Sequence, residues 1–125
     1  MKKKYVIATI SAITMMVVLT MLLNPLFLRT ENQIRDNLLN LTPIGISLDE
    51  VEVVVKERSN WRIMQSSSER GYVNHRYPSG AQTVGDKFIT VDLGRSSWLF
   101  YVRASWVFDE AGTLINIYVV RATAN

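Results

Sequence analysis

The sequence predicts an α+β fold in which one N-terminal transmembrane helix precedes two short helices packed on a four- to five-stranded antiparallel sheet. Residues 98–121 carry the sheet signal, because apolar side chains stand at every second position on both sides of a turn. Residues 47–58 combine a helix-start signal with apolar residues at helical spacing. Residues 5–23 contain no charged side chain, as expected of a membrane span.

Residues 1–28 are predicted to be an N-terminal membrane anchor. Lys2, Lys3 and Lys4 precede the uncharged run 5–23, and 19 residues reach about 28 Å, close to the thickness of the bilayer core. A cleaved secretory signal is the alternative, although its apolar core is usually about 7–15 residues long and ends at a small-x-small site. The lysines favour a cytoplasmic N-terminus. We therefore expect a single-pass cell-membrane protein whose domain is extracytoplasmic and whose residues 5–23 contact the lipid bilayer.

The basic character of the chain belongs to its first residues. Lys2, Lys3 and Lys4 account for the whole net charge of +3, since the remainder carries eleven basic and eleven acidic residues. The pI of about 9.4 therefore does not indicate a nucleic-acid-binding surface. Cysteine is absent, which excludes disulfides, thiolate nucleophiles and a lipid-modified N-terminal cysteine.

Two helices are expected between the anchor and the sheet. Residues 29–41 form a juxtamembrane helix and spacer, capped by Thr30 and ended before Pro43. Residues 42–125 form the α+β extracytoplasmic domain. Its helix begins at Ser47, which forms a capping box with Glu50, and continues to about residue 58. Its β-branched valines are mediocre helix formers, so packing on the sheet must hold it.

The sheet is expected to form from the second half of the chain. The expected strands are 61–65, a shorter one within 72–77, 87–93, 98–108 and 114–121. Residues 78–85 are rich in turn residues and are assigned to a connection. Asp109 and Gly112 supply the turn of the long hairpin. Alternation places Trp98, Phe100, Val102, Ala104, Trp106 and Phe108 on one core-facing side.

Two short motifs along residues 41–120 match a known family. The matching residues are Gly45, Ser47, Glu50 and Val51 at the helix start, and Trp106, Phe108, Asp109, Gly112 and Leu114 at the final hairpin. Together with the preceding export segment and short helix, they resemble the SmpA/OmlA (BamE-like) family. The resemblance implies that family's two helices on an antiparallel sheet, a fold shared with halves of the β-lactamase-inhibitor-protein architecture. It implies a binding module held at a membrane.

The chain departs from the family in two ways. Members of the outer-membrane assembly machinery are lipoproteins, whereas this chain has no cysteine to acylate. Their first helix often ends in a Gly-x-Pro turn, whereas residues 58–61 here are Arg-Ser-Asn-Trp. Both differences argue against a role in outer-membrane β-barrel assembly.

No motif in the sequence indicates catalysis, a cofactor or a metal. His75 is the only histidine, and one histidine without cysteine needs several converging carboxylates to form a zinc site. As a general base it would need an orienting carboxylate and a nucleophile nearby, and no serine lies in a Gly-x-Ser-x-Gly context. We therefore expect a protein that is not an enzyme.

The candidate partner-binding face consists of Tyr101, Arg103, Val107, Tyr118 and Arg121. If the helices cover only the apolar stripe, the two tyrosines are exposed together on the other side of the sheet, and tyrosine is enriched at interfaces. The two arginines lie on neighbouring strands and could recognise an anionic group. An ordinary solvated sheet face is the alternative.

These observations favour a membrane-anchored, noncatalytic, extracytoplasmic protein-interaction module of the bacterial cell envelope, with an envelope protein as its partner. Two alternatives stay open. One is an envelope ligand-binding protein or enzyme with a site around His75, Arg76 and residues 78–85. The other is a cleaved, secreted, inhibitor-like domain.

Overall fold

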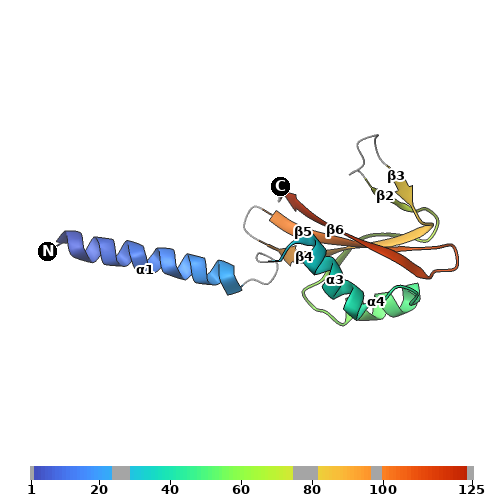
Figure 1. Cartoon of the computed structure of the whole chain (residues 1–125), viewed down its shortest axis with the longest axis horizontal. Coiled ribbons are helices and arrows are strands. Elements are labelled where there is room, and N and C mark those ends of the chain that lie inside the picture. The colour runs from blue at the N-terminus through green and yellow to red at the C-terminus, as the bar shows by residue number, and fades with distance from the viewer. Residues whose placement is uncertain (1, 24–28, 75–81, 97–99, 124–125) are drawn as a thin grey trace.

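The computed structural model describes residues 2–23, 29–74, 82–96 and 100–123, and it confirms an α+β fold (Figure 1). The elements in chain order are α1 (Lys2–Leu23), α3 (Glu31–Leu41), α4 (Leu48–Lys56), β1 (Arg62–Ser67), β2 (Tyr72–Asn74), β3 (Gln82–Val84), β4 (Lys87–Arg95), β5 (Phe100–Phe108) and β6 (Leu114–Thr123). Four strands form one antiparallel sheet in the order β1-β4-β5-β6, and β2 and β3 form a separate two-stranded ribbon. Both α3 and α4 lie on one side of the sheet, and α1 extends away from it.

The predicted transmembrane helix requires a correction. Crossing the roughly 30 Å hydrocarbon core of a bilayer takes about 20 consecutive apolar residues. Within the described part of the chain, no helix is both long enough and apolar enough to do so. The assignment of a transmembrane helix to residues 5–23 is therefore not supported.

The hydrophobic core lies between the helices and the apolar face of the sheet. The predicted stripe is confirmed at Val102, Ala104, Trp106 and Phe108, all of which are fully buried. Phe100, at the start of β5, is 38 % exposed, and Trp98 lies outside the described residues. Ile34 and Leu38 of α3, and Val51 and Val55 of α4, complete the core from the helix side.

Three β-bulges interrupt the alternation on which the sequence prediction relied. The pairing of β6 with β5 passes from Asn116 to Leu114 without using Ile115. Met64 in β1 and Leu93 in β4 are skipped in the same way. A bulge leaves one residue unpaired and exchanges the faces of the residues beyond it. As a result Leu114 is buried in the core, whereas Ile115 is 41 % exposed.

Side-chain caps determine where the two helices begin. Thr30 and Gln33 form a complete capping box at α3, in which each side chain bonds the other residue's backbone N–H. Ser47 Oγ accepts the backbone N–H of Glu50 at 3.2 Å and so forms the predicted half of the box at α4. The residue before Pro43 ends α3 as predicted, because proline disfavours helical geometry at the preceding position.

The segment before α4 docks on the turn of the long hairpin. Gly45 N–H donates to the carbonyl of Leu114, Leu114 N–H donates to Ile46, and Leu48 N–H donates to Gly112. The turn follows the prediction: Asp109 Oδ1 accepts the N–H of Thr113, and Gly112 has a φ of +82°. These bonds attach the helical layer to the sheet next to the core.

The β2–β3 ribbon covers one end of the other sheet face. Tyr72 packs on Phe88 and Tyr118, with ring centroids 6.0 and 5.3 Å apart. At Gly71 an added Cβ would overlap the carbonyl oxygen of Gly85, so the two backbones meet where only glycine fits. The predicted connection 78–85 thus contains a strand, Gln82–Val84, while residues 75–77 of the predicted strand 72–77 lie outside the described residues.

Candidate functional site

The sheet face opposite the helices is polar at its centre. Thr90 of β4 lies beside Ser105 of β5, and Ser105 lies beside Tyr118 of β6. The hydroxyls of Thr90 and Ser105 are 2.7 Å apart and hydrogen-bonded, although both residues are buried. The next row of the face is Asp92, Arg103 and Val120. The ribbon covers the end near Phe88, so this next row stands closer to the open end of the face.

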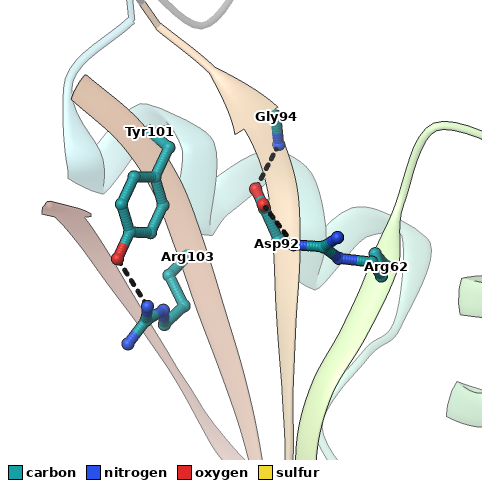
Figure 2. A network of polar contacts seen from close by, with 5 residues as sticks. All are labelled: Arg62, Asp92, Gly94, Tyr101 and Arg103. Atoms are coloured by element: carbon teal, nitrogen blue, oxygen red, sulfur yellow. Dashed lines mark hydrogen bonds and ion pairs between the residues drawn. The ribbon is translucent and has the colours of Figure 1, made fainter. Parts of the chain in front are cut away.

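Asp92 and Arg103 are cross-strand neighbours of opposite charge that do not pair with each other. Asp92 Oδ1 accepts the N–H of Gly94 at 2.9 Å, and its Oδ2 lies 3.8 Å from Arg62 Nη2. Figure 2 shows the Asp92 carboxylate turned toward Arg62 and Gly94, while Arg103 is turned toward Tyr101. The carboxylate of the cross-strand neighbour of Arg103 is therefore directed to other partners.

Arg103 keeps most of its hydrogen-bonding capacity unused. Its Nη2 donates to the hydroxyl of Tyr101, and its guanidinium carbon lies 5.1 Å from the centroid of that ring. Its Nε is buried and has no hydrogen-bond partner within the described chain. A guanidinium carries five N–H donors, so this half-buried cation is anchored by one phenol and lacks a counter-ion.

A pocket of about 240 Å³ opens beside Arg103. Its lining residues are Gln65, Arg70, Gly71, Tyr72, Val73, Phe88, Thr90 and Arg103. The ribbon forms one wall, β1 forms another, and β4 and β5 form the floor. No acidic side chain is among the lining residues, so the pocket is cationic, with apolar walls on the side of the ribbon.

The structure brings only part of the predicted partner-binding set together. Tyr101 and Arg103 are in contact on the open face, and Tyr118 is on the same face beneath Tyr72. Val107 shares that face but is fully buried, because the Gly85 backbone packs directly on its side chain. A residue in that position presents no surface to a partner.

Arg121 lies on the opposite, helix-covered face of the sheet. Its β5 neighbour is Val102, a core residue. Its Nη2 donates to the carbonyl of Arg29 at 2.7 Å, and its backbone N–H donates to Glu31 at 3.2 Å. Arg121 therefore joins β6 to the beginning of α3, and it is separated from Arg103 by the thickness of the sheet.

A second pocket, of about 290 Å³, lies between α3 and β6. Arg35 crosses it, donating from Nε to the carbonyl of Ile117 at 2.9 Å and from Nη2 to the side chain of Asn116. The guanidinium of Arg35 therefore joins α3 to strand β6 at the edge of the sheet. Its donors are less available to a ligand than those of Arg103.

The described residues contain no arrangement that indicates a metal site. No group of three or more histidine, cysteine, aspartate or glutamate side chains in this part of the chain is placed to hold a metal. His75 and Arg76, the centre of the alternative site, lie outside the described residues, as does most of the connection 78–85.

Sequence reasoning missed the pocket residues Gln65, Arg70 and Thr90 and the pairing of Asp92 with Arg62. Alternation along β4 does place Thr90 and Asp92 on the face opposite Ile89 and Val91, so that signal was present in the sequence. The position of Arg70 was not inferable, because it depends on how the ribbon folds over the sheet.

Comparisons with protein-family models, curated protein sequences and solved structures found no match for this chain. The resemblance to the SmpA/OmlA family therefore stays a prediction from its two short motifs.

Proposed function

We propose that this domain is a noncatalytic protein-interaction module that binds its partner on the open sheet face around Tyr101, Arg103, Asp92 and Arg62. The observation that carries the proposal is the uncompensated guanidinium of Arg103 beside an open pocket. Buried and half-buried charges are normally paired, and here the neighbouring carboxylate is directed away. A group of the partner is the natural counterpart of this cation.

The dimensions of the site favour a protein partner over a metabolite. Small-molecule sites usually occupy about 300–1,000 Å³, whereas the pocket beside Arg103 has about 240 Å³. Arginine and tyrosine are the residue types that most often anchor protein interfaces, especially where they are half-buried and fixed in place. Tyr101 holds Arg103 by both a hydrogen bond and a cation–π contact, so the pair presents a preorganised surface.

Site-specific photocrosslinking tests the proposal. A benzophenone amino acid replaces Gln65, an exposed residue that lines the pocket, in the full-length chain expressed in its native cells. The matched control places it at Val53, which is exposed on α4 on the helix side of the domain. We expect one adduct of constant mass from position 65, none from position 53, and loss of the adduct in Arg103→Met.

Adducts of equal yield from both positions, or none from either, would contradict the proposal.

We also propose that the protein is located at the cell envelope. Cell fractionation of the tagged full-length chain tests this location, and recovery of the chain outside the envelope fraction would contradict it.

A further inference from the structure

We propose that the pocket beside Arg103 receives the carboxylate of an acidic side chain, glutamate or aspartate, from the partner protein. This inference rests on the proposed function and specifies the chemistry of its binding site. It follows from three features of the structure: the unpaired cation, the composition of the pocket wall and the fixed geometry of the pocket.

The first feature is the charge balance of the open face. Arg62, Arg70 and Arg103 stand in or beside the pocket, whereas the acidic Asp92 accepts the N–H of Gly94 and forms an ion pair with Arg62 at 3.8 Å. The local surface therefore carries an excess of positive charge. Within the described chain, the side chain of Arg103 has Tyr101 as its hydrogen-bond partner and forms no ion pair. Guanidinium groups match the planar carboxylate with two parallel hydrogen bonds.

The second feature is the mixed character of the pocket wall. Tyr72, Val73 and Phe88 form its apolar side, and Gln65, Thr90 and the two arginines form its polar side. A glutamate side chain has the same division, with methylene groups leading to a planar anion. Phosphate sites, in contrast, usually gather several arginines or the N–H groups of a helix N-terminus. Here one arginine is half-buried, the second is exposed, and no helix N-terminus lines the pocket.

The third feature is the fixed geometry of the site. Thr90 is held by its bond to Ser105, and Tyr72 is held between Phe88 and Tyr118. Gly71, which lines the pocket, packs closely against Gly85. An entering side chain therefore meets walls that are already in place, so little ordering cost accompanies binding.

The test is an NMR titration of the full-length protein that follows the Nε–Hε signal of Arg103, which is assigned by its loss in Arg103→Lys. The probes are N-acetyl-glutamate N-methylamide, its neutral glutamine analogue and inorganic phosphate. We expect a saturable shift of the Arg103 signal with the glutamate probe and no saturable shift with the glutamine probe.

Variants locate the binding site. Arg70→Met is expected to weaken binding of the glutamate probe several-fold, because it removes the second cation of the pocket. Lys56→Met is the matched control: it also removes one exposed cation, but Lys56 lies on α4, on the helix side of the domain, and does not line the pocket, so affinity should change by less than about twofold. Backbone amide spectra of each variant confirm that the fold is retained.

Three results would overturn the inference. They are equal shifts with the glutamate and glutamine probes, tighter binding of phosphate than of the glutamate probe at Arg103, and no saturable shift up to about 50 mM probe.

The failure of this inference and the failure of the proposed function give different results. A partner crosslinked at position 65 without a carboxylate response removes only the carboxylate inference, whereas a carboxylate response without any crosslinked partner removes the interaction module.

Discussion

The core of this domain contains a buried hydrogen bond as well as apolar contacts, and it joins Thr42 and Trp106. Both are fully buried. The indole N–H of Trp106 donates to Thr42 Oγ1 at 2.9 Å, and that hydroxyl donates to the carbonyl of Leu38 at 2.7 Å. One hydroxyl at the end of α3 therefore satisfies both a sheet side chain and a helix carbonyl. This connection gives the helix a defined position on the sheet.

Thr42→Val is expected to lower the free energy of unfolding by about 1–3 kcal/mol, because the buried indole N–H of Trp106 loses its partner, whereas the carbonyl of Leu38 keeps the backbone N–H of residue 42. Thr42→Ser keeps the hydroxyl and is the control. Urea unfolding followed by tryptophan fluorescence measures the difference. Equal stability of the valine and serine variants would show that the hydroxyl contributes nothing beyond its packing.

Elements of this fold are positioned by backbone contacts as much as by side chains, and the β2–β3 ribbon depends on glycine. Gly85 has a φ of +69°, and a Cβ there would overlap Val107 Cγ1 and lie 2.7 Å from the carbonyl oxygen of Phe108. The connection between the ribbon and β4 therefore rests directly on the sheet. Because the ribbon forms one wall of the pocket beside Arg103, this contact also shapes the candidate site.

Gly85→Ala is expected to destabilise the protein by about 1–3 kcal/mol, through both its positive φ and overpacking against the sheet. Gly45→Ala is the control for backbone strain alone, since Gly45 has a φ of +99° but open space where a Cβ would stand; it should cost about 1–2 kcal/mol, less than the combined strain and overlap at Gly85. Thermal unfolding of both variants measures the contrast. Equal losses would mean that the close approach to Val107 is unimportant.

The whole molecule is asymmetric about its sheet. Two helices pack on one face and bury its core residues, whereas a short ribbon covers one end of the other face. The remainder of that face carries Arg103, Asp92 and Arg62. The core residues that the structure describes all lie between Ile34 and Val119, so the domain contains its own core, and α1 supplies none of it.

A chain of residues 29–125 is therefore expected to unfold cooperatively with the same thermal midpoint as the full-length protein. Circular dichroism and NMR amide spectra of the two chains test this expectation. Loss of cooperative unfolding in the shorter chain would place the domain boundary before residue 29.

Local sequence signals determined much of this architecture. The caps at Thr30 and Ser47, the turn at Asp109 and Gly112, and the stripe from Val102 to Phe108 all follow from short-range geometry, because helix periods, strand alternation and turn types are properties of neighbouring residues. The α+β fold and the core side of the long hairpin were predictable for that reason. The transmembrane helix, predicted from the length and apolarity of residues 5–23, was not supported.

Tertiary structure alone decided the bulges, the ribbon and the candidate site. The bulge at Ile115 places Leu114 in the core, and no alternation pattern shows where a strand gains an unpaired residue. Arg121 and Arg103 looked alike in sequence, yet they lie on opposite faces of the sheet. Whether Arg103 pairs with Asp92 depends on which other donors surround that carboxylate. Such long-range competition among side chains exists only after the strands have assembled, and it leaves Arg103 unpaired at the pocket.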